Sequence, residues 1–168
     1  VCKIAVNTTL AACAGGCVGM VLSWAVFKKP DLTMCLNGIL AGLVGITANC
    51  DCVTNGQSLI IGGVAGVIVM AAIMLLDKLK IDDPVGAFPV HGCCGIWACI
   101  AAGIFGGKDV VVQTYGSFAI AGFSLVVMLV VFGLLKVVGL LRVSRQEEVE
   151  GLDVHEHGMP CYATDSAY

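Results

Sequence analysis

Five long windows without a charged residue divide this chain, and they are separated by short clusters of Lys, Arg, Asp and Glu. Each window holds 19 to 26 residues, and about 20 helical residues are enough to cross the hydrocarbon core of a bilayer. None of the windows alternates apolar and polar residues as the strand of a membrane barrel would. The pattern therefore predicts an all-α, polytopic membrane protein with five transmembrane helices. The windows are 4–27, 32–50, 52–76, 84–107 and 110–135.

The composition excludes the other common classes of protein. Apolar residues make up 58% of the 168 positions and charged residues only 12%, whereas a soluble domain is about 25% charged. The net charge of −3 and the lack of a basic stripe argue against nucleic-acid binding. The windows are also rich in glycine, and Gly38-x-x-x-Gly42 and Gly62-x-x-x-Gly66 are pairs of small residues that allow helices to approach closely.

The distribution of basic residues predicts the orientation of the five spans. Five spans place the two ends of the chain on opposite sides, and the cytoplasmic side is the one richer in Lys and Arg. The side that includes the C-terminal region has seven basic residues, and the other side has only Lys3 and Lys108. We therefore expect a multi-pass protein of the plasma membrane with a membrane bundle at 1–143 and a cytoplasmic tail at 144–168. The seven are Lys28, Lys29, Lys78, Lys80, Lys136, Arg142 and Arg145.

The fourth window begins with residues that disfavour a regular helix. Pro84, Gly86 and Pro89 lie within six residues, so we expect the chain to enter the membrane partly extended, with regular helix from about His91. Irregular backbone at membrane depth is tolerated only inside protein or beside a water-filled cavity. At up to about 3.3 Å per extended residue, His91 would lie near the middle of the membrane.

His91 is the only ionisable residue well inside an apolar window, apart from cysteine. Charging an imidazole in hydrocarbon is costly, so we expect a neutral ring with one donor and one acceptor nitrogen. The residue could simply be a core histidine bonded to a neighbouring helix, but an intramembrane ionisable group next to a broken helix favours a functional role.

A second interpretation is an intramembrane metal or thiol-redox protein that uses His91 and nearby cysteines. On a helix, His91 and Cys94 share a face and Cys99 lies further along it, whereas Cys93 points elsewhere. No other His or carboxylate is expected at membrane depth to complete a zinc or copper site, and a redox pair would favour a C-x-x-C spacing that is absent. We therefore expect neither a metal nor a cofactor.

The sequence resembles the ammonium transporter (Amt/Mep/Rh) family over nearly its whole length. The segment DDPVGAFPVHGCCGIWACIAAGIF, residues 82–105, is similar to the family's second histidine segment. The similarity extends upstream to NGILAGLVGITANCDCV (37–53) and LIIGGVAGV (59–67), and downstream to EGLDVHEHGMPCYA (150–163), which resembles the family's tail motif.

The resemblance implies a transporter rather than an enzyme, with eleven spans of which this chain would hold the seventh to the eleventh. It implies that ammonium or ammonia crosses the bilayer through a hydrophobic pore in each subunit of a homotrimer. His91 matches the second of two pore histidines, Thr47 a threonine near the pore wall, and Ala87 and Phe88 the apolar lining. A cytoplasmic regulatory protein at the inner face is a candidate partner.

The resemblance also implies which spans the chain lacks, and this affects the activity expected of the chain alone. The chain begins with Val1 rather than Met, and its first span starts almost immediately. The resemblance implies that the first pore histidine, the aromatic gate and the outer cation site belong to segments absent here. We therefore expect a fragment that is inactive alone; an ammonium sensor on the same fold is a further alternative. In the tail, His155 replaces the threonine that many plant members phosphorylate, which argues against phosphoregulation at this position.

Overall fold

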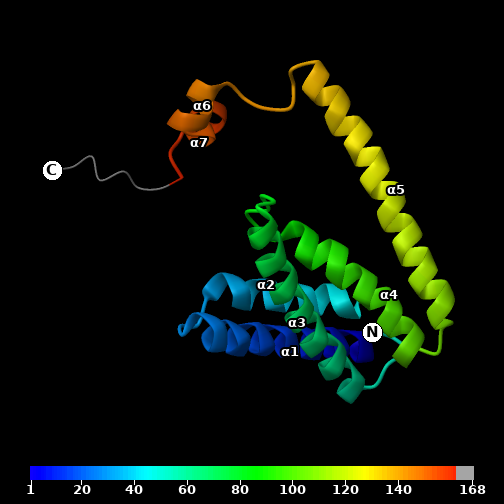
Figure 1. Cartoon of the computed structure of the whole chain (residues 1–168). Helices are drawn as coiled ribbons and strands as arrows, with labels where there is room; N and C mark the ends of the chain where they lie inside the picture. Colours follow the sequence, from blue (N-terminus) through cyan, green and yellow to red (C-terminus); the bar gives the residue numbers. More distant parts are fainter. Residues whose placement is uncertain (162–168) are drawn as a thin grey trace. The chain divides into compact units, whose positions relative to one another are not determined.

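The computed structural model describes residues 1–161, and every regular element in that part of the chain is helical (Figure 1). The chain forms two compact units, Val1–Gly122 and Phe123 onward, whose boundary falls within one helix. The helices are α1 (Cys2–Phe27), α2 (Leu32–Ile46), α3 (Asn55–Leu79), the π-helix η1 (Phe88–Cys93), α4 (Cys94–Phe105), α5 (Val110–Val137), α6 (Arg145–Glu150) and α7 (Leu152–His157).

Four helical segments of the described residues are long and apolar enough to cross a membrane. They are α1, α3, the continuous segment Phe88–Phe105 and α5. The second predicted span corresponds to α2, which is apolar but only 15 residues long and ends at Ile46 rather than near Ala48. The all-helical membrane fold is therefore confirmed.

Side chains near the chain reversals fix where the helices begin. After α1, Lys28 adopts a left-handed conformation, and the Asp31 carboxylate accepts a hydrogen bond from the Met34 backbone N–H (2.9 Å) at the start of α2. At the opposite end of α2, Thr54 and Gln57 form a reciprocal capping box that begins α3. These caps satisfy backbone donors that have no partner within the first turn of a helix.

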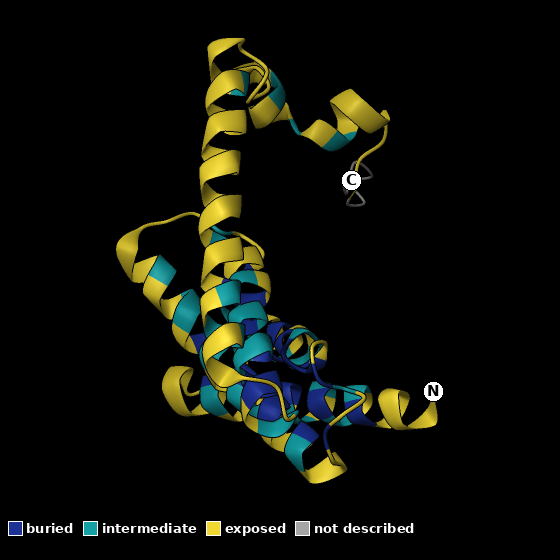
Figure 2. Ribbon diagram, turned by 90° about the vertical axis from the view of Figure 1, so that its right-hand side faces the viewer, coloured by how far each residue is buried: buried dark blue, intermediate teal, exposed yellow. Residues whose placement is uncertain are grey.

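Glycine allows the first three helices to pack with their backbones in contact. A Cβ atom on Gly62 of α3 would lie 2.1 Å from the carbonyl oxygen of Ala11 in α1, and one on Gly42 of α2 would lie 2.2 Å from the same oxygen. A Cβ atom on Gly15 would lie 2.2 Å from the Gly38 carbonyl oxygen. The expected role of the small-residue pairs is thus confirmed. Figure 2 shows the buried residues gathered where these helices cross.

The packed interior is made largely of small and branched side chains from α1 to α4. One cluster includes Ala11, Ile46 and Ile61, and a second includes Ala65 and Val90, with the indole of Trp97 packed against both. The Trp97 Nε1–H donates a hydrogen bond of 3.0 Å to the Ile61 carbonyl. This core holds the segment after Pro84 against α2 and α3, which positions the candidate site.

Candidate pore site on the π-helix

The residues around His91 form a π-helix rather than the extended chain expected from the sequence. A turn at Pro84 and Val85 leads through Gly86, which has a φ of +73°, into η1 at Phe88, and regular α-helix begins at Cys94. The expectation of extended entry and of regular helix from about His91 was therefore wrong. Because the helical rise per residue is well below the extended value, the depth of His91 estimated for an extended chain was also too large.

The Asp83 side chain explains why a helix can begin beside two prolines. Its Oδ1 accepts a hydrogen bond from the Ala87 backbone N–H (2.8 Å), and its Oδ2 accepts one from the Phe88 N–H (2.9 Å). Pro89 has no N–H and therefore needs no partner in the first turn. One carboxylate thus satisfies the donors that the start of the helix leaves open.

The π-helix presents one apolar ring and one imidazole on its exposed side. Pro89 and Val90 are buried in the bundle, whereas Ala87, Phe88 and His91 are exposed, and Phe88 has 57% of its surface accessible. Within residues 1–161, the His91 imidazole makes no hydrogen bond. A π-helix widens the backbone locally and occurs often at functional sites. The structure therefore brings together three of the four predicted site residues, with the imidazole available to a ligand.

Among the described residues, the Thr47 side chain makes no hydrogen bond with Ala87, Phe88 or His91. It lies directly after α2, and its hydroxyl donates a hydrogen bond of 2.7 Å to the Val44 carbonyl of its own helix. The side chain is exposed, so it remains able to face a ligand passageway. Its assignment rests on the family resemblance alone.

The metal or thiol-redox interpretation gains no support. Over residues 1–161, no three His, Cys, Asp or Glu side chains are grouped so that they could hold a metal ion. The Cys94 thiol is buried and donates to the Ala65 carbonyl of α3 at 3.6 Å, so it is directed toward α3. In the loop after α2, desolvation and the neighbouring Asp51 carboxylate raise the pKa of Cys52, which makes its thiol a poorer nucleophile at neutral pH.

Sequence reasoning missed two residues that shape this site. Asp83 was not singled out, although an Asp a few residues before a helix is a common capping signal. Gly92 was not singled out, yet a Cβ atom there would lie 2.7 Å from Cδ2 of Phe88. The Phe88 ring thus packs directly against the backbone of Gly92. This contact is visible only in the structure, so the sequence alone could not show the role of Gly92.

Comparison with known proteins identifies relatives that match nearly the whole chain. A sequence model of the ammonium transporter family matches residues 1–162. A putative ammonium transporter of Synechocystis sp. is 48% identical over 92% of this chain and 36% of its own length. The ammonium transporter Amt2 of Archaeoglobus fulgidus is 39% identical over 95% of this chain and 38% of its own length.

Two solved structures share the fold. A sensor Amt protein superposes with a TM-score of 0.86 at 32% identity, covering 92% of this chain and 41% of the other. Mep2 of Candida albicans superposes with a TM-score of 0.78 at 28% identity, covering 86% of this chain and 37% of the other. The chain thus spans well under half the length of these relatives.

Proposed function

Because the chain belongs to the ammonium transporter family, we propose that it forms part of a membrane pore that conducts ammonium or ammonia. The single observation that carries this proposal is the exposed His91 on a π-helix inside an otherwise uncharged membrane segment. The relatives named as ammonium transporters match the segment that contains it. The activity belongs to the complete protein, of which this chain is a part.

The proposed mechanism follows from the cost of desolvating a cation. Carrying a charged ammonium ion through an apolar passage without compensation costs several kcal/mol or more, whereas neutral ammonia passes far more cheaply. The His91 imidazole offers a donor or an acceptor where water is scarce, and Phe88 and Ala87 line the passage beside it. Thr47 contributes a hydroxyl near the wall. Imidazoles can also pass a proton along a route of their own.

The proposed arrangement in the membrane uses the whole chain. Helices α1 to α5 correspond to five spans, the seventh to the eleventh of the family fold, and residues 144–168 form a tail in the cytoplasm. The excess of basic residues on the side of the tail supports this orientation. We propose a homotrimer whose tails contact neighbouring subunits and a cytoplasmic regulatory protein. Residues 162 and 163 of the predicted tail motif lie outside the described residues.

The test is uptake of labelled methylammonium by cells that lack their own ammonium transporters and express the complete protein. We expect His91→Ala to abolish uptake or to change its selectivity for ammonium over methylammonium, because no polar partner then remains on η1. Thr9→Ala, which removes an exposed polar side chain of α1 that bonds only to its own helix, is the control and should transport normally. Wild-type uptake by His91→Ala would contradict the proposal.

A further inference from the structure

Two adjoining hollows lie along the second half of α1, within the first unit. One has a volume of about 450 Å³ and is lined by Val21, Trp24, Ala25 and Lys28. The other has a volume of about 280 Å³ and is lined by Cys17, Val18, Val21 and Leu22. Because the two share Val21, they form one groove on α1, which we call the α1 groove. It is apolar along most of its length and carries a cation at the end of the helix.

The side chains of the α1 groove follow the order of environments across one leaflet of a bilayer. Val21 and Trp24 are 58% and 59% exposed, and Lys28 lies one turn beyond Trp24 on the same face of the helix. Tryptophan is enriched at the membrane–water boundary, where its ring sits at the level of the headgroups, and lysine extends its charge beyond it. The groove thus passes from aliphatic side chains through an indole to an ammonium group.

The backbone of Lys28 gives an independent indication that its charge has a role. Its φ is +62°, in the left-handed region where glycine usually ends a helix because it has no Cβ atom. Its Nζ donates a hydrogen bond of 3.2 Å to the Ala25 carbonyl, which leaves two of its three N–H donors free. Within residues 1–161, neither Lys28 nor Lys29 forms an ion pair, and the carboxylate of Asp31 caps α2. These two charges are therefore left for an anionic partner to balance.

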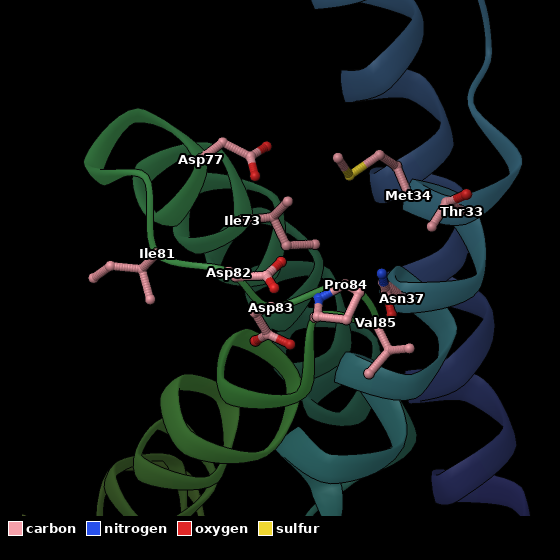
Figure 3. A pocket seen from close by; sticks show the side chains of 11 residues that line it. Thr33, Met34, Asn37, Ile73, Asp77, Ile81, Asp82, Asp83, Pro84 and Val85 are labelled. Carbon is pink, nitrogen blue, oxygen red and sulfur yellow. The ribbon is translucent and has the colours of Figure 1, made fainter. Parts of the chain in front are cut away.

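Lys80 provides a comparison within the same chain. It ends α3 in the same left-handed conformation, with a φ of +58°, and the proposed orientation also places it on the cytoplasmic side. Figure 3 shows that Asp77, Asp82 and Asp83 lie on the last turns of α3 and on the connection that follows it. Their negative charges would repel an anion. An anionic partner is therefore expected at the end of α1 and not at the end of α3.

The partner that fits these features is an anionic phospholipid. Anionic lipids give the cytoplasmic leaflet a negative surface potential, which attracts basic residues at the membrane boundary. We infer that the α1 groove binds one anionic phospholipid of this leaflet. An acyl chain lies along Val21, the indole of Trp24 lies at the level of the ester groups, and the phosphate meets the ammonium groups of Lys28 and Lys29. The inference rests on the proposed arrangement in the membrane and requires no conduction past His91.

The experiment measures quenching of Trp24 fluorescence by brominated lipids in nanodiscs that hold the complete protein. The nanodiscs are made of phosphatidylcholine and contain the same small fraction of either dibrominated phosphatidylglycerol or dibrominated phosphatidylcholine. Subtraction of the signal of Trp24→Phe isolates the fluorescence of Trp24. We expect the relative binding constant to favour phosphatidylglycerol by about tenfold or more, because two lysines attract its headgroup.

Three variants separate the charge of Lys28 from its place in the fold. Lys28→Gln should lower the preference for phosphatidylglycerol by about fivefold, since it removes one of the two charges. Lys80→Gln is the matched control, because it removes a lysine with the same backbone conformation, and it should change the preference by less than about twofold. Lys28→Gly suits the left-handed backbone, so its unfolding temperature should stay unchanged or rise while its lipid preference falls as in Lys28→Gln.

Three outcomes would overturn the inference. They are equal quenching of Trp24 by the two lipids, an unchanged preference in Lys28→Gln, and no quenching of Trp24 by either lipid, which would show that a protein segment covers the groove. Failure of the proposed function has a different signature, since uptake of methylammonium by the wild-type protein would be absent while the lipid preference remained. The wild-type measurement tests the inference even where a variant does not fold.

Discussion

The carboxylate of Asp83 accepts a hydrogen bond of 2.9 Å from the backbone N–H of Phe88, the first residue of the π-helix. This bond links a loop residue to the helix that presents His91. With the parallel bond to Ala87, it replaces intrahelical partners that the first turn lacks. The position of His91 therefore depends on a residue that lies outside the apolar window.

We expect Asp83→Ala to destabilise the protein by about 1–2 kcal/mol, as the loss of a helix cap does. Both backbone donors would lose their acceptor, and the start of η1 would fray. The free energy of unfolding of the chain in detergent micelles measures the effect. Asp82→Ala is the matched control, because the Asp82 carboxylate makes no hydrogen bond to described residues; equal destabilisation by both variants would contradict the capping role.

A second prediction concerns the backbone contact between α3 and α1. Gly62→Ala should destabilise the bundle by about 1–3 kcal/mol, because the new methyl group would lie 2.1 Å from the Ala11 carbonyl oxygen. A rigid backbone atom cannot move aside as a flexible side chain can. Unfolding of the purified protein, followed by circular dichroism, reports the change.

Gly56 provides the control on the same helix. A Cβ atom there has nothing within 4 Å, so Gly56→Ala should leave stability unchanged or raise it by up to about 1 kcal/mol through helix propensity. If the two alanine variants behaved alike, close packing between α1 and α3 would not explain the effect at Gly62.

The third prediction tests a buried polar cluster beside the loop between α2 and α3. The Asn7 Nδ2 group donates to the carbonyls of Cys50 (2.9 Å) and Val53 (3.0 Å), and Ser58 Oγ donates to Asn7. Asn7→Ala would leave these buried carbonyls unpartnered, so we expect a loss of about 2–4 kcal/mol in the free energy of unfolding.

Thr9→Ala is the control for Asn7→Ala. Thr9 is exposed on the same helix, and its hydroxyl bonds only to the Ala5 carbonyl one turn before it. Its removal should change stability by less than about 0.5 kcal/mol. A loss at Asn7 no larger than this would show that the loop does not depend on the buried amide.

The sequence predicted the helical membrane class and the close helix contacts because these depend on patterns that are local along the chain. Charge-free windows set the spans, and the glycine spacing at Gly38 and Gly42 repeats on one helix face. His91 stood out since it is a polar residue in an apolar window. Its role in conduction remains a proposal.

The features that the sequence did not predict depend on contacts between residues that are far apart along the chain. Nothing local shows that Asn7 will meet the loop at Cys50, 43 residues later, or that Asn37 will lie beside the connection after α3. The π-helix was missed because two prolines normally disfavour a helix, and the compensating cap at Asp83 becomes clear only from its bonds.

The second unit offers a prediction about pH. Asp153 Oδ2 accepts a hydrogen bond from the Cys161 backbone N–H (2.7 Å), and this bond holds the pKa of Asp153 below its usual range. A carboxyl group whose pKa is lower in the folded state stabilises that state at every pH above its unfolded pKa, which is roughly 4. This stabilisation is lost as the pH falls through the pKa of the folded state. We expect the Cys161 amide resonance to move toward its unfolded position only below about pH 4.

The same titration with Asp153→Asn is the control for this effect. An amide oxygen does not titrate, so the acid-dependent shift at Cys161 should disappear. Glu150 also has a lowered pKa, owing to hydrogen bonds from Gln146 and then from His155. A shift at Cys161 that persists in Asp153→Asn would assign the transition to another carboxyl group and contradict the prediction.

The final prediction links Gly92 to the Phe88 ring. A methyl group added by Gly92→Ala would lie 2.7 Å from Cδ2 and 2.8 Å from Cε2 of that ring, and Phe88 is exposed enough to rotate away. Stability should therefore change by less than about 1 kcal/mol, whereas uptake of methylammonium should change because the ring lines the proposed passage. Gly95→Ala, whose methyl meets nothing within 4 Å, is the control.

A double-mutant cycle distinguishes this steric route from a direct effect of the new methyl group. Without the ring there is no clash, so Gly92→Ala in the Phe88→Ala background should have little further effect on uptake. The two substitutions should then be clearly non-additive, as expected for residues in contact. Additive effects on the uptake rate would show that Gly92 acts independently of Phe88, and the ring would lose its assigned place in the passage.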